Sequence, residues 1–289
     1  MAGRSEAGPT ALRIMLGAHL RRLRERAELT RAEAGWAIRA SESKISRMEL
    51  GRVGFKQRDV EDLLTLYSVT QTGERGRLLQ LAKDANNRGW WHRYNDVTPD
   101  WFDAYLGLEA AADLIRTYEV QFVPGLLQTP EYTRAVARLT SGTERSADEL
   151  DRIVALRKTR QAVLDRDPPL RLWAVIEESV LHRPIGGPQV LRDQLSALLQ
   201  AIQRPNVTVQ IIPLGSAGHA ATAGAFSVLR FPQADLPDVV YLEHLTSALY
   251  LDKRDDLDTY THVLDSLTVS APPPRQAEEQ LTAILRQLD

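Results

Sequence analysis

The chain has 289 residues, 43% of them hydrophobic, and it carries 36 Lys and Arg against 38 Asp and Glu. This length allows about two domains with sizeable cores. The absence of cysteine excludes disulfides, thiolate metal sites and cysteine nucleophiles. No apolar run approaches the roughly 18 to 20 residues of a membrane helix and no signal-peptide pattern opens the chain, so we expect a soluble, cytoplasmic protein without a membrane partner.

The first part of the chain is predicted to form a small all-helical domain. Residues 1–11 are small and polar, which predicts a flexible arm. Leucines at helical spacing predict a helix over 12–27, and further helices are expected from about Asp59 and over 72–87. Two more helices fall between Thr30 and Gly51, so the predicted domain over 12–87 has five.

Residues 30–51 carry the signals of two short helices joined by a tight turn. Thr30 followed by Glu33 is a capping-box pattern, and Ser41 is suited to cap the second helix. Gly35 provides the small surface that two closely crossing helices need, and Gly51 predicts the end of the second helix. This spacing is typical of a helix-turn-helix.

The second of these helices has one apolar side and one polar side. Ile45 and Met48 are at inward positions, while Ser, Glu, Lys and Arg occupy the other face. Such a face fits the DNA major groove, where these side chains contact base edges and phosphates. The alternative is an ordinary helical hairpin with a solvated polar face.

The distribution of charge favours the DNA interpretation. Residues 1–60 contain 13 Lys and Arg against 7 Asp and Glu, a net charge of +6, and the remaining residues carry −8. A basic domain attached to an acidic body is the expected electrostatic pattern of a DNA-binding protein.

An aromatic segment over 88–107 separates this domain from the rest. It contains three of the five tryptophans. We expect it to act as a hydrophobic hinge, and a ligand or partner pocket is the alternative. The candidate pocket residues are Trp90, Trp91, His92 and Tyr94, together with His219 in a loop rich in Gly and Ala.

Residues 108–289 are predicted to form a mixed α/β regulatory or dimerisation domain. The segment into Tyr118 is interpreted as either helix or strand, and Pro130 as the start of a helix. Strands are expected over 171–178, 207–213, 225–231 and 239–245. Helices are expected over 147–166, 188–203 and 255–267, with a last one ending at Leu288. The whole chain is therefore expected to be α+β, with a mixed sheet of four or more strands beside the helical domain.

Chemistry-bearing residues are sparse in this sequence. The six histidines are scattered, and no nucleophile–base pair, metal motif or phosphate-binding Gly-rich loop emerges. We therefore expect no enzyme, no metal and no cofactor, with an enzyme fused to a DNA-binding head as the weaker alternative. Glu177 and Glu178 follow one predicted strand and Glu243 and His244 follow another. Ion pairing or solvent exposure is favoured for them over convergence near a pocket.

Several longer strings resemble known families. SESKISRMELGR resembles the second helix and exit of the XRE-type (lambda-repressor-like) helix-turn-helix. LAKDANNRGWWHRYND, YEVQFVPGLLQTPEYTRAV, RPNVTVQIIP, GAFSVLRF and VVYLEH resemble the C-terminal module of a large actinobacterial regulator family, which includes WhiJ-like developmental regulators and antitoxin-like regulators. The resemblance covers the chain from about Leu16 to Leu288.

The resemblance implies roles for particular residues. Arg24 and Glu49 match a structural ion pair. Arg39 replaces the usual glycine of the turn, so either the turn is built differently or Arg39 accepts a positive φ, and its guanidinium is then a candidate phosphate contact. Glu42 stands where Gln is frequent, and its role is open. The DNA-binding residues implied or predicted are Arg31, Arg39, Ser41, Glu42, Ser43, Lys44, Ser46, Arg47 and Arg52.

These expectations combine into one function. We expect a homodimeric, sequence-specific transcriptional regulator that binds a double-stranded DNA operator, because such domains normally read two half-sites. Its C-terminal module is expected to sense a small-molecule effector or to bind a small partner protein. The alternative is an antitoxin-like component of a two-protein system that acts through protein–protein binding.

Overall fold

The computed structural model describes residues 9–140, 144–216, 218–221, 224–232 and 236–288. It confirms the α+β class, with a helical N-terminal region and a C-terminal mixed sheet. The chain divides into two compact units. The first comprises Met1–His92, Asp103–Ala111 and Phe231–Pro237, and the second comprises Arg93–Phe102, Ala112–Arg230 and Asp238–Asp289. The aromatic segment over 88–107 is thus shared between the two units.

The first unit begins with five helices. They are α1 (Pro9–Arg26), α2 (Arg31–Ala37), α3 (Glu42–Glu49), α4 (Gln57–Leu66) and α5 (Thr72–Ala85). Helix α1 starts three residues before the predicted position, so 9–11 are helical where an arm was expected, and 1–8 lie outside the described residues. A proline suits this first turn because its missing N–H would have no helical partner there.

The five helices enclose one hydrophobic core. Its centre is formed by side chains that are at most 1% exposed, including Leu16, Leu20, Ile45, Met48, Phe55, Val60, Leu63 and Leu64. Full burial of each such side chain contributes about 1.5–3 kcal/mol relative to exposure. The core therefore fixes α3 through its apolar side and leaves the opposite side to solvent.

The aromatic segment forms a short 3₁₀ helix and then an α-helix. The 3₁₀ helix covers Trp90–Tyr94, and α6 covers Phe102–Ala111. Within the first unit, Trp91 is 2% exposed, and Gly107 of α6 leaves no room for a Cβ beside Thr10 and the Trp91 ring. Trp91 thus behaves as a core residue of the first unit.

The second unit is built on a six-stranded sheet. Its strands are β1 (Leu114–Glu119), β2 (Arg171–Glu177), β3 (Val207–Ile212), β4 (Phe226–Arg230), β5 (Val239–Glu243) and β6 (Ala248–Leu251), in the order β3-β2-β1-β4-β5-β6. The β1–β2 and β2–β3 pairs are parallel, whereas β1–β4, β4–β5 and β5–β6 are antiparallel. Strand β1 is therefore the point at which the sheet changes from parallel to antiparallel.

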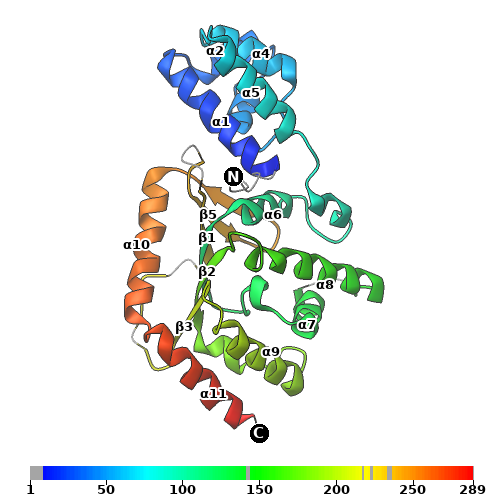
Figure 1. Cartoon of the computed structure of the whole chain (residues 1–289), viewed down its shortest axis with the longest axis vertical. Helices are drawn as coiled ribbons and strands as arrows, with labels where there is room; N and C mark the ends of the chain where they lie inside the picture. Colours follow the sequence, from blue (N-terminus) through cyan, green and yellow to red (C-terminus); the bar gives the residue numbers. More distant parts are fainter. Residues whose placement is uncertain (1–8, 141–143, 217, 222–223, 233–235, 289) are drawn as a thin grey trace. The chain divides into compact units, whose positions relative to one another are not determined.

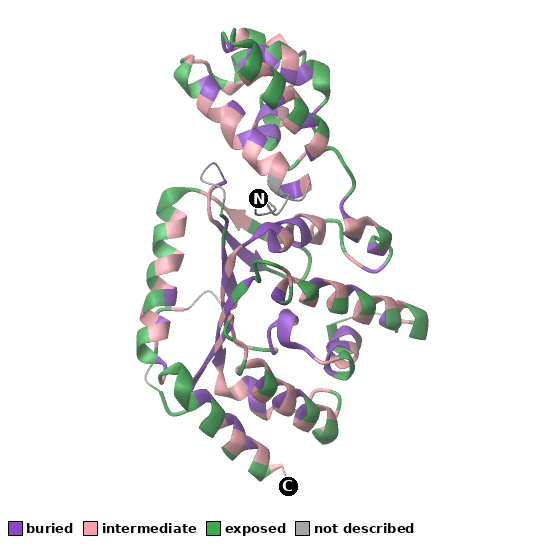
Figure 2. Ribbon diagram, viewed as in Figure 1, coloured by how far each residue is buried: buried purple, intermediate pink, exposed green. Residues whose placement is uncertain are grey.

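Helices cover both faces of this sheet. Figure 1 shows α10 (Arg254–Ser270) on one face, with α7 (Pro130–Thr140), α8 (Ala147–Gln161) and α9 (Pro188–Ala201) on the other. Because both faces are covered, the central strands are buried along most of their length, as Figure 2 shows. The last helix, α11 (Ala277–Gln287), contacts α9 and β3.

The strand positions agree with the sequence pattern, apart from two elements. The segment into Tyr118 is α6 followed by β1, which resolves the open choice between helix and strand. Strand β6 was not predicted, because Ala248–Leu251 is four residues long and lacks the alternation of a longer strand. Helix α8 ends at Gln161 rather than 166, and a 3₁₀ turn over Ala162–Leu164 follows it.

Candidate functional site

The two short helices of the first unit are capped as their sequence predicts. The Glu33 N–H donates to Thr30 Oγ1 at 3.2 Å, and the Thr30 N–H donates to Glu33 Oε2 at 2.7 Å, which completes a capping box. The Thr30 N–H and the Thr30 hydroxyl both donate to the Glu33 carboxylate, and these two hydrogen bonds lower the pKa of Glu33. Ser41 caps α3 by accepting from the Lys44 N–H at 3.2 Å. Both N-cap predictions are confirmed.

The turn between α2 and α3 depends on two backbone positions. A Cβ on Gly35 would lie 2.7 Å from the Ala40 carbonyl oxygen, so a larger residue would push the turn away. Arg39 has φ +54°, the left-handed conformation that glycine usually supplies. The turn thus keeps the ordinary path, and Arg39 accepts the strain.

An ion-paired network ties α1, α2 and α3 together. Arg24 donates to Glu49 from Nε at 2.5 Å and from Nη2 at 3.1 Å, and the Glu49 side chain is 2% exposed. The hydrogen bond to Glu49 is the main cause that raises the pKa of Arg24. Arg31 Nε donates at 3.0 Å to Glu49 Oε2, the oxygen that also accepts from Arg24 Nη2. The predicted Arg24–Glu49 pair is confirmed, and Arg31, predicted as a DNA contact, is also part of it.

Helix α3 buries one side and exposes the other. Ile45 and Met48 are each 1% exposed and lie in the core. The solvent side consists of residues predicted to contact DNA: Ser41, Glu42, Ser43 and Arg47 are exposed, and Lys44 and Ser46 are half-buried. Arg47 Nε donates weakly to the Ser43 carbonyl oxygen at 3.4 Å. This places hydroxyls, a carboxylate and a guanidinium on one helix face.

Three other cations were predicted to contact DNA. Two of them flank α3 in the sequence, and the third belongs to an ion pair. Arg39 in the turn and Arg52 after α3 are both exposed. Lys44, by contrast, places its Nζ 2.6 Å from Asp59 Oδ2 of α4. This pair could not be predicted from the sequence, because its members are 15 residues apart and lie on different helices.

The five residues predicted to line a pocket are divided between the two units. In the first unit, Trp90 and Trp91 meet edge to face with centroids 5.7 Å apart, and His92 stacks on Trp91 and lies 3.9 Å from Asp103. These contacts favour the packing interpretation of the aromatics. In the second unit, Tyr94 is 7% exposed and packs against the guanidinium groups of Arg93 and Arg152.

Tyr94 also lines an open groove of about 560 Å³ beside α8. The groove residues are Arg93, Tyr94, Asp148, Asp151, Arg152 and Ala155. Arg152 binds Asp96 at 2.6 Å and Arg134 pairs with Asp151, so the charges of the groove are largely compensated internally. The groove is therefore lined by two cations and two carboxylates, of which one of each is ion-paired with a residue outside it.

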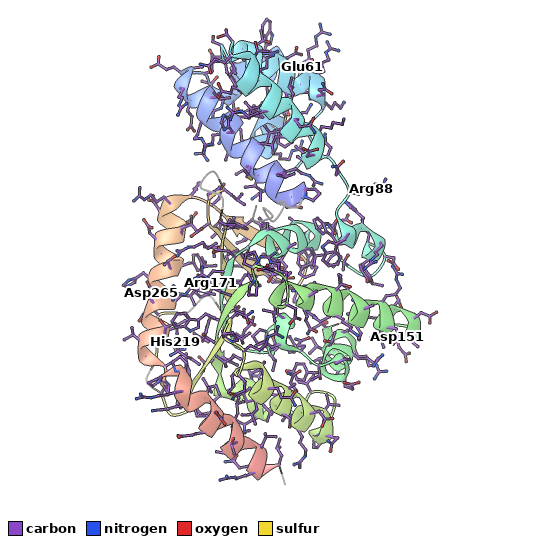
Figure 3. All side chains as sticks on the ribbon, viewed as in Figure 1. Glu61, Arg88, Asp151, Arg171, His219 and Asp265 are labelled. Carbon is purple, nitrogen blue, oxygen red and sulfur yellow. The ribbon has the colours of Figure 1, made fainter. Side chains whose placement is uncertain are left out.

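His219 is held inside the second unit by both ring nitrogens. Its Nε2 lies 2.9 Å from Glu177 Oε1, which also accepts from the Tyr118 hydroxyl at 2.7 Å. Its Nδ1 accepts from the Ala221 N–H at 3.3 Å, so the neutral ring carries its proton on Nε2 and donates it to Glu177. Burial raises the pKa of Tyr118 above its ordinary value, with the Glu177 hydrogen bond as a second cause. Figure 3 shows His219 and Asp265 on the side of the sheet that α10 covers.

The four residues considered for convergence at strand ends do not form one cluster. Glu177 pairs with His219, and Glu178 accepts from the Leu214 N–H at 2.8 Å. Glu243 accepts from the Tyr241 hydroxyl at 2.9 Å. Its side chain points to the other face of the sheet from that of Glu177, because alternate residues of a strand point to opposite sides. His244 is exposed. These contacts and exposures agree with the favoured interpretation, which was ion pairing or solvent exposure.

A polar cluster at the end of β1 was missed by sequence reasoning. Ser227 of β4 donates to Thr117 Oγ1 at 2.9 Å, and Thr117 donates to Glu119 Oε1 at 2.9 Å. Burial raises the pKa of Glu119 to about 7, helped by the charge of Glu243 and opposed by Thr117 and Arg157. Thr117 and Glu119 lie toward the carboxyl end of β1, and open α/β sheets usually bind ligands at the carboxyl ends of their strands. The sequence signal that could have indicated this cluster is the alternation of Thr117 and Glu119 in a strand-like segment.

The VPGLLQTPEY segment after β1 is fixed by buried amide groups. Gln194 of α9 is fully buried; its Nε2 donates to the Leu127 carbonyl oxygen and its Oε1 accepts from the Thr129 N–H, both at 2.8 Å. Gln128 Nε2 donates to the Val123 carbonyl oxygen at 2.8 Å. A Cβ on Gly125 would collide with the Arg157 guanidinium, so glycine makes room for that cation. These contacts explain why the segment needs its particular residues.

Two further features bear on function. Among the described residues, no group of three or more His, Asp or Glu side chains is placed to hold a metal ion. Within the same part of the chain, no helix has the length and apolar character needed to cross a membrane.

Comparison with known proteins identifies two matching family models. Residues 15–78 match a helix-turn-helix domain, which covers α2, α3 and the turn between them. Residues 102–283 match a domain of unknown function (DUF5753). No curated protein and no solved structure matches the chain. Because the second match spans more than half of the 289 residues, the chain belongs to the DUF5753 family and carries a DNA-binding helix-turn-helix domain at its N-terminal side.

Proposed function

We propose that this protein is a homodimeric, sequence-specific transcriptional regulator of the XRE type. The observation that carries the proposal is the exposed polar face of α3, held by two capped helices and an ion-paired network. The face bears Glu42, Ser43, Ser46 and Arg47, and exposed Arg39 and Arg52 stand on either side of α3 in the sequence. Hydroxyl and carboxylate groups suit base edges, whereas the arginines suit guanine or phosphate.

The small size of the DNA-contacting surface supports the proposed dimer. One α3 reads few base pairs, and regulators with this motif gain operator affinity by placing two recognition helices about one helical turn apart. Sedimentation of the full chain at micromolar concentration, alone and with operator, measures this. A monomer that binds DNA one to one at every concentration contradicts the dimer.

Specific DNA binding is tested by selecting operators from a random pool of duplexes with the full-length protein. We expect an enriched sequence with two related half-sites, bound at least a hundredfold more tightly than mixed-sequence DNA at moderate salt. A selected pool that stays random, or binding that is equal for both duplexes, overturns sequence-specific recognition.

The C-terminal module is proposed to sense a small-molecule effector. The polar cluster of Thr117, Glu119 and Ser227 supports this, because it lies at the carboxyl end of β1, where open α/β sheets usually bind ligands, and carries a carboxyl with a pKa near 7. Resemblance to WhiJ-like and antitoxin-like regulators favours a small partner protein as the alternative occupant of this module.

Operator affinity provides the test of sensing. A fractionated small-molecule extract is added to the protein–operator complex, and in a parallel experiment the small protein encoded by a neighbouring gene is added. An effector that acts through the polar cluster shifts operator affinity in wild type and not in Thr117→Val. If neither addition changes affinity, the module is a dimerisation domain without a sensing role.

We also propose that the protein has no catalytic activity. His219 was the best candidate for chemistry, and both of its ring nitrogens are engaged within the protein, which supports a structural role. Hydrolysis of ester, phosphoester or glycoside reporters by the purified chain, lost in His219→Ala, would overturn this.

A further inference from the structure

Lys44 is directed toward the protein rather than away from it. It is the third residue of α3, and its Nζ lies 2.6 Å from Asp59 Oδ2, in the first turn of α4. The side chains of Lys44 and Asp59 are 31% and 13% exposed, so the contact is partly shielded from water. This is shorter and better shielded than the ion pair of Arg58 with Asp62, which spans 3.8 Å between exposed side chains.

Moving Lys44 to DNA would leave the Asp59 carboxylate without its partner. A poorly solvated carboxylate that loses its counter-charge is costly, and a nearby phosphate would repel it. Arg39, Arg47 and Arg52 face no such penalty, because they are exposed and none has an acidic partner among the described contacts. The cations of the helix-turn-helix thus differ in their availability to DNA.

We propose that Asp59 is a positioning residue that keeps the Lys44 ammonium out of the DNA contact. Helix α3 then reads DNA through Glu42, Ser43, Ser46 and Arg47, without a lysine near its N-terminus. A lysine at that position would bind the guanine O6 and N7 acceptors. Asp59 therefore limits which bases the first turn of α3 accepts, and this inference rests on the proposed DNA-binding function.

The salt dependence of DNA binding distinguishes a lysine that contacts DNA from one that does not. Each phosphate neutralised by a protein cation steepens the plot of log affinity against log salt by about 0.9. The probe is a duplex selected with the wild-type protein, and all variants are made in the full-length chain. The variants are Asp59→Asn, which frees Lys44, and the double variant Lys44→Met, Asp59→Asn, which removes both charges, keeps the net charge and retains an unbranched side chain at position 44.

The proposal predicts a changed salt slope for one variant and an unchanged slope for the other. Asp59→Asn is expected to steepen the slope by up to about 0.9 for each α3 bound, whereas the double variant keeps the wild-type slope. Arg52→Ala is the positive control, with a shallower slope. A double-variant slope that is shallower by about 0.9 per α3 overturns the proposal, because Lys44 then contacts DNA in the wild type. An Asp59→Asn variant with both the wild-type slope and the wild-type base preference overturns it too, because Asp59 is then not what withholds Lys44.

The bases selected in the operator provide a second readout. If the Lys44–Asp59 pair were purely structural, breaking it would leave the selected bases unchanged. Operators selected from a random pool with Asp59→Asn are expected to gain a guanine at a position where wild-type operators show none. Thermal unfolding checks the fold of each variant. If Asp59→Asn does not fold, the slope of the double variant still decides whether Lys44 contacts DNA in the wild type. Failure of the wild type to bind any selected duplex would overturn the proposed function instead.

Discussion

Arg24 and Glu49, 25 residues apart, form a two-point hydrogen-bonded ion pair between α1 and the last residue of α3. Both side chains are nearly buried, with 9% and 2% of their surfaces exposed. Because Glu49 is buried while Glu42 and Ser43 at the start of α3 are exposed, the pair fixes the end of α3 from inside the first unit.

Replacement of Glu49 by Gln is expected to destabilise the first unit by about 3 kcal/mol, because the nearly buried Arg24 loses its main counter-charge and keeps only the longer contact with Glu25. Calorimetric unfolding of the full chain measures this. Asp62→Asn, which removes an exposed ion pair at 3.8 Å, is the matched control and should change stability by less than about 0.5 kcal/mol. Equal effects of the two substitutions would contradict the role given to Glu49.

Arg39→Gly is expected to separate stability from DNA binding. Glycine adopts φ +54° without the cost of about 1–2 kcal/mol that a side chain incurs, and part of this gain is offset by the greater freedom of glycine in the unfolded chain. The variant should therefore be more stable by about 0.5–1 kcal/mol and bind DNA more weakly. Arg39→Ala keeps the strain and loses the charge, so it should show the loss of affinity without the gain in stability.

Arg47→Ala is expected to weaken operator binding by about 10- to 100-fold without changing the unfolding temperature. Arg47 is exposed on α3, and its contact within the protein is a weak 3.4 Å bond to a backbone carbonyl. Fluorescence anisotropy with a selected operator measures the affinity. Arg77→Ala, an exposed cation on α5, is the control; a similar loss there would mean that the effect is one of overall charge.

Glu119 is expected to make the second unit less stable as pH rises. Its pKa is about 7 in the folded protein against an ordinary 4.5, so between these values the folded state binds the proton more strongly. Stability from this group is complete below pH 4.5 and is lost as pH rises through 7, an effect on the order of 3 kcal/mol. Unfolding of wild type and Glu119→Gln from pH 4.5 to 8 should differ by this amount.

Glu243→Gln provides a second test of the same group. The negative charge of Glu243 is one cause of the raised pKa of Glu119, so its removal should move the pH-sensitive range to lower pH. An unchanged range in Glu243→Gln, together with a parallel response of Glu119→Gln and wild type, would assign the pH dependence to other groups.

Local signals in the sequence predicted the recognition elements well. The caps at Thr30 and Ser41 act within three residues, and the apolar period of α3 places Ile45 and Met48 correctly, because both effects depend on neighbours along the chain. Strands β2 to β5 were predicted for the same reason, since their buried runs are nearly continuous, whereas β1 was left open between helix and strand and β6 was not predicted. Pro130 and Pro188 marked helix starts because proline fits the first turn.

Features that depend on distant residues were not predictable from one sequence. The Lys44–Asp59 pair joins two helices, the Glu177–His219 pair joins a strand to a loop 42 residues later, and Ser227 reaches Thr117 from 110 residues away. Each requires the fold to be known first. The pattern around Arg39 left two possibilities open, and only the backbone angle separates them.

The change of direction at β1 also has a consequence for synthesis on the ribosome. Strand β1 pairs with β2 once residue 177 has emerged, but its other edge has no strand beside it until β4 is completed at residue 230. At about 5–20 residues per second, those residues take several seconds to appear. During that interval the polar groups of Thr117 and Glu119 face an incomplete sheet, so this edge of the nascent chain is where we expect a chaperone to be needed.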